Sequence, residues 1–139
     1  MGKRKKMVLL GIFFMLFCIL SCGCGIEEKE DKKLKDMDFT IVSDKEIPDE
    51  LQKIIGEKKE GQMKLTYLTD KNLYIIRGYG EQKTGGYSIQ VKDLYLTENA
   101  VYLKTELIGP GENDATEEAK SYPYIVIKTE KTEDVVIFE

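Results

Sequence analysis

The chain has 139 residues and a formal net charge of −4, with 21 basic residues, 25 acidic residues and no histidine. This length is enough for one domain with a hydrophobic core and too short for two. The acidic balance offers no basic patch to the phosphates of a nucleic acid, which argues against nucleic acid as a partner.

Residues 1–21 have the layout of a secretory signal peptide. The basic run "KRKK" at 3–6 precedes an uncharged apolar run of fourteen residues, "MVLLGIFFMLFCIL", at 7–20. A membrane-spanning helix needs about 20 apolar residues, so a cleaved signal is favoured over a permanent span.

The end of this signal resembles a bacterial lipobox, in which a cysteine is diacylated and becomes the new N-terminus. The stretch "ILSC" at 19–22 places an aliphatic residue three positions before Cys22 and a small residue directly before it, and Cys24 is the alternative site. Because two acyl chains hold a protein stably where one does not, the pattern predicts a lipid anchor on the outer face of a bacterial cell membrane. No cysteine follows position 24, so neither a disulfide nor a cysteine–histidine metal site is expected in the folded part.

Residues 22–38 are predicted to form the lipidated N-terminus and a charged, solvated tether. From 26 to 38, ten of thirteen residues are charged, which leaves little apolar surface to bury. A flexible coil of this kind would hold the domain roughly 20 Å from the lipid. Cleavage before Cys22 would remove four basic residues and change the net charge from −4 to −8, so an anionic lipid surface would repel the body of the protein.

The domain itself is expected at 39–139, beginning with a short strand at 39–42. One helix is predicted at 48–59, "PDELQKIIGEKK", because proline and two acidic residues open it and two lysines close it. Its apolar residues follow helical spacing and form one stripe suited to packing on a sheet: Leu51, Ile54 and Ile55.

From residue 64 the pattern changes to short runs rich in β-branched and aromatic residues, separated by turn residues. These runs lie at 64–69, 73–80, 86–96, 100–107, 123–129 and 134–138. The alternating apolar residues are odd-numbered up to Val91 and even-numbered from Leu94 onward, so the two halves of this run would face opposite sides of a regular strand. A bulge near 92–93 would place them on the same side. Since parallel pairing needs helical crossovers and only one helix is available, we expect an α+β, strand-dominated fold: a mainly antiparallel sheet or sandwich of about six strands with one short helix.

One connection, "GPGENDATEEAKS" at 109–121, is longer than loops usually are. Its length is consistent with a functional surface and equally with a mobile loop.

The stretch "GEQKTGGY" at 80–87 raises the question of a phosphate-binding loop. In a P-loop the lysine and the hydroxyl residue follow the second glycine, whereas here Lys83 and Thr84 precede Gly85 and Gly86. A strand is expected next, so no helix N-terminus would face a phosphate. A strand connection in which the two glycines supply a positive φ or a close backbone approach is the better interpretation.

The sequence also lacks a catalytic set. Without histidine, acid and base roles would fall to carboxylates, lysine or tyrosine, and the acidic residues are spread through charged turns. Asp93 interrupts an apolar run, but a role in a bulge or strand edge explains it better than catalysis. We therefore expect a protein that is not an enzyme and has no metal or cofactor.

Tyrosine is the main aromatic residue of the folded part, which has eight tyrosines and only two phenylalanines after residue 38. Tyrosine packs its ring while its hydroxyl stays wet, which suits sheet faces and also binding surfaces. Sheet packing explains most of the eight. The candidates for a recognition surface flank the glycine loop and the proline of "SYPY": Tyr79, Thr84, Gly85, Gly86, Tyr87, Tyr122, Pro123 and Tyr124.

These motifs together resemble the C-terminal domain of the protease complex subunit PrcB. The pattern there is Thr-Gly-Gly-Tyr and an alternating strand, then a loop with proline, then Tyr-Pro-Tyr and a hydrophobic strand. It matches "TGGYSIQV" at 84–91, Pro110 and "YPYIVIK" at 122–128, within the range 73–138. The resemblance implies a bacterial lipoprotein of the kind that accompanies a surface protease, and it transfers no catalytic residue.

The sequence thus favours a non-catalytic lipoprotein whose domain binds another protein or a peptide, such as a secreted protease. The alternative is a cell-surface lipoprotein that binds a small molecule, which requires an apolar pocket with convergent polar groups. A carboxylate-based hydrolase would require two acidic side chains meeting in a cleft.

Overall fold

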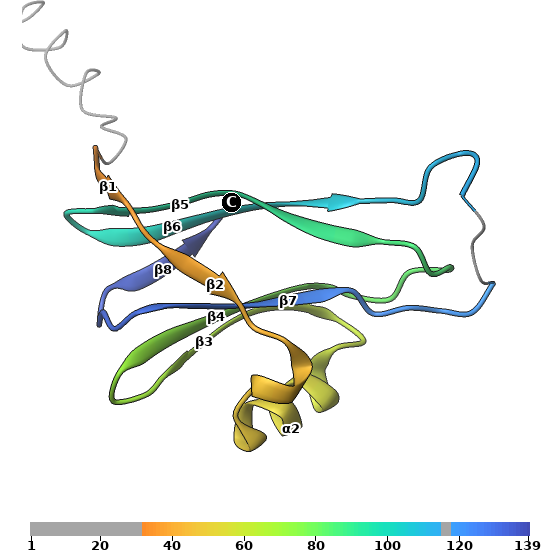
Figure 1. The fold of residues 1–139 in the computed structure, drawn as a ribbon, viewed down its shortest axis with the longest axis horizontal. Coiled ribbons are helices and arrows are strands. Elements are labelled where there is room, and N and C mark those ends of the chain that lie inside the picture. The colour runs from red at the N-terminus through yellow and green to blue at the C-terminus, as the bar shows by residue number, and fades with distance from the viewer. Residues whose placement is uncertain (1–31, 115–117) are drawn as a thin grey trace, which may run out of the picture. The chain divides into compact units, whose positions relative to one another are not determined.

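The computed structural model describes residues 32–114 and 118–139, so the predicted signal, Cys22 and Cys24 lie outside the described residues. The described part forms two four-stranded sheets, in the orders β1-β5-β6-β8 and β2-β7-β4-β3 (Figure 1). The strands are β1 (Lys33–Asp36), β2 (Phe39–Ile41), β3 (Gln62–Leu68), β4 (Asn72–Tyr79), β5 (Ser88–Thr97), β6 (Ala100–Ile108), β7 (Tyr124–Glu130) and β8 (Val135–Phe138). The helices are η2, a 3-10 turn (Asp44–Glu46), and α2 (Asp49–Lys58).

The predicted fold class is confirmed: the fold is strand-dominated, has one α-helix, and pairs its strands mainly in antiparallel fashion. The described residues contain eight strands, compared with the six or so expected. The pair β6–β8 is parallel. The chain achieves this pairing without a helical crossover because β7, which lies between them in sequence, belongs to the other sheet.

Two hydrophobic clusters divide the domain into three layers. The first lies between the sheets and contains Leu73 and Ile75 of β4 with Leu94 and Leu103 of the opposite sheet. The second lies between the second sheet and α2 and includes Ile76. Because side chains alternate along a strand, β4 sends odd-numbered residues to one layer and even-numbered ones to the other.

Helix α2 is bound to the sheet by two of the three residues of the predicted apolar stripe, whereas Ile54 is only partly buried and lies outside the second cluster. Leu51 and Ile55 are 1% and 3% exposed and contact Met63 of β3 and Val126 of β7 within the second cluster. None of the helices formed by the described residues is long and apolar enough to cross a membrane.

The segment from 33 to 36, expected to be part of the tether, is instead strand β1, which pairs with β5. The chain then crosses to the other sheet and continues as β2, paired with β7. At the crossing Met37 is 5% exposed, and its N–H donates to the carbonyl of Leu94 at 3.0 Å. The compact unit therefore begins at Lys32 and not at Phe39.

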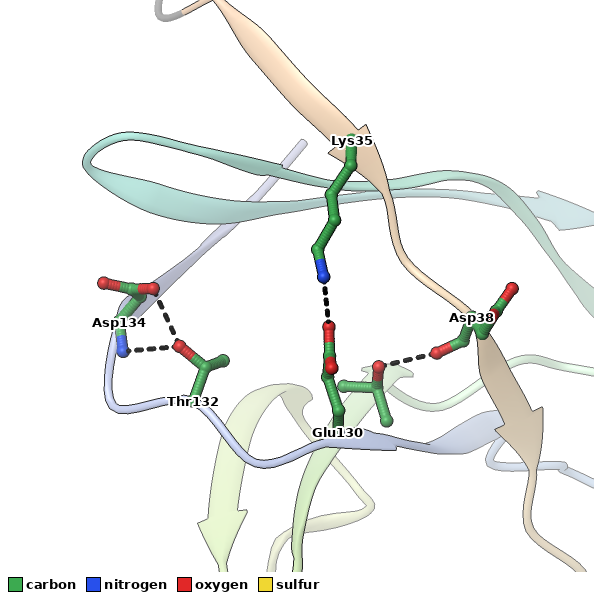
Figure 2. A network of polar contacts seen from close by, with 6 residues as sticks. Lys35, Asp38, Glu130, Thr132 and Asp134 are labelled. Carbon is green, nitrogen blue, oxygen red and sulfur yellow. Dashed lines mark hydrogen bonds and ion pairs between the residues drawn. The ribbon is translucent and has the colours of Figure 1, made fainter.

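Polar contacts reinforce this crossing (Figure 2). Lys35 Nζ lies 2.8 Å from a carboxylate oxygen of Glu130 in β7, and the Thr129 hydroxyl donates to the carbonyl of Asp38 at 2.7 Å. The high charge of the segment hid its strand character, because the solvent-facing lysines of an edge strand look like those of a tether.

The bulge predicted near 92–93 is present, since the register of β5 against β6 shifts between Val91 and Asp93. Asp93 is the Cα partner of Lys104 at this irregularity.

Candidate recognition surface

The structure brings the glycine loop and the "SYPY" motif together, although 33 residues lie between Tyr87 and Ser121. An isolated antiparallel bridge joins Gln82 and Ser121, whose N–H groups donate to each other's carbonyls at 2.8 and 3.0 Å. The Ser121 hydroxyl also donates to the carbonyl of Thr84 at 2.6 Å. The candidate residues therefore occupy one end of the sandwich.

The glycines of this loop differ in what they require. Gly80 and Gly86 have φ values of +77° and +84°, in the left-handed region that favours glycine. Gly86 thus has the positive φ that was expected of the loop glycines. Gly85 has no positive φ, and a Cβ there would meet nothing within 4 Å.

Tyr79 lies between the two sheets. Its hydroxyl is 2.6 Å from the hydroxyl of Thr105 on β6 of the opposite sheet, and the guanidinium carbon of Arg77 is 4.0 Å from the centre of its ring. Its N–H donates to the carbonyl of Pro123 at 3.1 Å. Tyr79 thus fixes both sheets and the "SYPY" segment to one another.

Tyr87 is placed differently, at the start of the long connection. A Cβ built on Gly109 would lie 3.4 Å from the Tyr87 ring, so this ring packs directly on the glycine backbone.

Tyr122 lies closer to the surface and is surrounded by charge. Its hydroxyl donates to the carboxylate of Glu81 at 3.3 Å, and Lys59 Nζ is 5.5 Å from its ring centre. Glu81 also forms an ion pair with Lys120 at 3.3 Å. Desolvation, and secondly the negative charge of Glu81, raise the pKa of the Tyr122 hydroxyl, so it remains a neutral donor.

Tyr124 points to the helix side of its sheet. Its hydroxyl donates to Asp44 at 3.0 Å, and its pKa is raised first by desolvation and then by this hydrogen bond. The ring lines a pocket of about 220 Å³ beside α2, which is below the usual range for small-molecule sites of roughly 300–1,000 Å³. The other lining residues are Asp44, Ile47, Gln52, Ile55, Gly56 and Lys59.

The candidate residues therefore share one end of the domain, but their side chains face different layers. Sequence reasoning missed three charged neighbours of the tyrosines, namely Asp44, Lys59 and Glu81. Only the position of Lys59 at the end of the predicted helix hinted at a role. Within 32–114 and 118–139, no group of three potential ligand side chains could hold a metal ion.

The comparisons with known proteins agree with the motif pattern. Residues 73–130 match the PrcB C-terminal family model. The resemblance drawn from the motifs is thereby confirmed for this segment. The PrcB C-terminal match runs from β4 to β7 and contains the glycine loop, the long connection and "SYPY". It leaves out β1, β2, α2, β3 and β8. No curated protein and no solved structure matches the chain.

Proposed function

We propose that this protein is a non-catalytic, lipid-anchored extracytoplasmic accessory module that binds another protein or a peptide, as part of a secreted protease complex. The observation that carries this proposal is the PrcB C-terminal match over 73–130, which contains both motifs of the candidate surface. The resemblance to the protease complex subunit PrcB supports the link to a protease complex.

The chemistry of the candidate surface supports binding of a protein. Tyr122 is half-buried, with its ring near Lys59 and its hydroxyl on Glu81. Aromatic side chains held in place by neighbours lose little entropy on binding and are common anchors of protein interfaces. The long connection begins at Gly109 beside Tyr87 and ends at Ser121 beside Thr84, so both of its ends lie at the same end of the domain.

The anchor part of the proposal is supported by the sequence around Cys22. A surface location would keep the module beside a secreted enzyme, and attachment raises the effective concentration of the partner.

Site-specific photocrosslinking in the native membrane tests the proposal. A photoreactive phenylalanine analogue replaces Tyr122, and the same analogue replaces Tyr67 as a matched control. Tyr67 is also half-buried and also donates its hydroxyl to a glutamate, Glu50, at 3.0 Å. We expect an adduct with a secreted protein from position 122 and none from position 67.

The identity of the adduct separates two parts of the proposal. A protease in the adduct supports the accessory role, whereas a different protein keeps the binding role and removes the protease. Equal labelling from positions 122 and 67, or no protein adduct from position 122, would refute the proposed surface.

A small-molecule-binding lipoprotein is the second candidate, because the pocket beside α2 combines apolar walls with Asp44, Gln52 and Lys59. Its small volume limits it to a ligand of few atoms. A thermal-shift screen with amino acids and small sugars tests it, and Gly56→Leu, which would fill the pocket edge, should abolish any shift found.

A further inference from the structure

The sandwich is closed along one side and open along the other. On the closed side the β1–β2 crossing joins the two sheets. On the other side β3 and β8 are the edge strands of their sheets, and a groove of about 490 Å³ lies between them. Its lining is mixed. The apolar part includes Leu68 of β3, Leu73 of β4, and Val136 and Phe138 of β8. The polar part consists of Lys64, Thr66, Thr132, Glu133 and Asp134.

Strand β8 is short, but it has no other feature that usually protects an edge. Its four residues, "VVIF", include no charge, proline or bulge, and Val135 and Ile137 are 66% and 38% exposed. Such an edge is a template for pairing with a further strand. Edge strand β3 is different, because it carries Lys64 on the face that borders the groove.

Lys64 stands directly opposite Arg77 of β4 in the antiparallel register, so two positive side chains occupy the same face. Like charges in this arrangement destabilise a sheet. Among the described residues neither side chain has a carboxylate within ion-pair distance. Arg77 is only 8% exposed, and its Nε has no hydrogen-bond partner.

A buried guanidinium without a counter-charge is costly, since desolvation of the charge is not repaid. Its other contacts are the ring of Tyr79 and the carbonyl of Gly78, neither of which is an anion. The rest of the domain is acidic, with 21 acidic against 16 basic residues from 32 to 139. Two acidic side chains, Glu133 and Asp134, line the same groove, but neither lies within ion-pair distance of Lys64 or Arg77. The two cations can therefore accept a carboxylate from a partner.

We propose that an extended segment of a partner protein, with alternating apolar side chains and one acidic residue, adds to β8 as a further strand. Its apolar side chains fill the groove between β8 and β3, and its carboxylate meets Lys64 beside Arg77. Backbone pairing supplies affinity in this mode of recognition, and the side chains that enter the groove supply specificity. The inference rests on the proposed function and names the binding mode and the chemistry of the partner.

A second copy of this chain fits the edge poorly. If two β8 strands paired antiparallel with all four residues overlapping, Asp134 of each would stand opposite Glu139 of the other. Two opposed acidic pairs would weaken such a dimer. A partner segment of different sequence avoids this repulsion and can offer its acid to Lys64.

Peptide display on the purified lipidated full chain in detergent tests the proposal. We expect the enriched peptides to alternate apolar residues and to contain one aspartate or glutamate. A synthetic peptide of that sequence is then measured by fluorescence anisotropy against the native protein and two variants.

Lys64→Glu should weaken binding by about tenfold, as expected when a partly desolvated charge pair is lost. The matched control Lys71→Glu, in the exposed β3–β4 turn, makes the same change outside the groove and should leave binding within about twofold.

The reciprocal change provides a further test, because replacing the peptide's acid by lysine should restore binding to Lys64→Glu. Hydrogen exchange should show slower exchange of the β8 amides that face away from β6. Equal effects of Lys64→Glu and Lys71→Glu, or peptides without an acid preference, would overturn the inference. Dimerisation of the native protein that Lys64→Glu abolishes would also overturn it, by assigning the edge to a second copy.

Failure of this inference can be told apart from failure of the proposed function. If photocrosslinking from position 122 finds a protein partner while Lys64→Glu leaves its capture unchanged, the partner binds the tyrosine surface and the β8 edge is not its site. If neither experiment finds a protein, the binding role itself fails.

Discussion

Gly78 of β4 lies opposite Met63 of β3, and their contact leaves no room for a side chain at position 78. A Cβ there would come within 2.7 Å of Met63 Cε and 3.2 Å of Met63 Cβ, and Met63 is 1% exposed. Gly78→Ala should therefore reduce the free energy of unfolding by about 1–3 kcal/mol through overpacking. Urea denaturation followed by tyrosine fluorescence measures this loss.

Gly85→Ala serves as the control for the change at position 78. Gly85 has open space around its Cα and no positive φ, so the substitution should change the free energy of unfolding by less than about 0.5 kcal/mol. A larger loss for Gly85→Ala than for Gly78→Ala would contradict the packing account.

The contact between Tyr79 and Thr105 is the second test of a single residue, because it joins the two sheets through hydroxyl groups 2.6 Å apart. Tyr79→Phe removes one partner and should cost about 1 kcal/mol of stability. In a double-mutant cycle with Thr105→Val, the two losses should sum to more than the loss in the double variant, because both single changes break the same bond. Additive losses would mean that the hydroxyl groups do not interact in solution.

Among the elements, α2 depends on its apolar face because its own sequence weakens it. Gly56 lies in the last turn of the helix, and a Cβ there would meet nothing within 4 Å. Gly56→Ala should therefore stabilise the protein by about 0.5–1 kcal/mol, the difference in helix propensity between the two residues. Thermal unfolding by circular dichroism should show a higher Tm, and an unchanged or lower Tm would refute the estimate.

Strand β1 illustrates what an element at the edge of the sandwich contributes. Met37, directly after β1, is buried in the main core, whereas the Lys35–Glu130 pair is exposed and worth little by itself. A chain beginning at Phe39 should lose about 3 kcal/mol or more of stability relative to one beginning at Lys32, because burial of a side chain such as Met37 contributes about 2–5 kcal/mol.

Guanidinium denaturation of the two shortened chains measures this difference. Lys35→Ala in the longer chain is the control and should cost less than about 1 kcal/mol. Equal stability of the two shortened chains would mean that residues 32–38 belong to the tether and not to the folded domain.

For the molecule as a whole, the sequence predicted those features that depend on residues close together in the chain. The runs of β-branched and aromatic residues predicted six strands, and the parity change predicted the bulge at 92–93. Charged residues concealed β1, where only the position after the strand is buried. The meeting of Gln82 with Ser121 and the opposition of Lys64 to Arg77 depend on long-range register, which no local pattern encodes.

In the proposed function, the location of the whole molecule would depend on one atom, the thiol sulfur of Cys22. Because the aliphatic residue of the lipobox pattern stands three positions before Cys22 and not before Cys24, Cys22→Ala should abolish lipid attachment, and Cys24→Ala should leave it intact.

Mass spectrometry of the mature N-terminus and fractionation into membrane and soluble pools measure both effects, with globomycin as an independent block on processing. A soluble mature protein from the native sequence, or full lipidation of the Cys22→Ala variant, would contradict the assignment. Since the h-region is too short to favour a permanent span, loss of the acyl chains should release the domain from the membrane and reduce its capture of a membrane-proximal partner while leaving its fold unchanged.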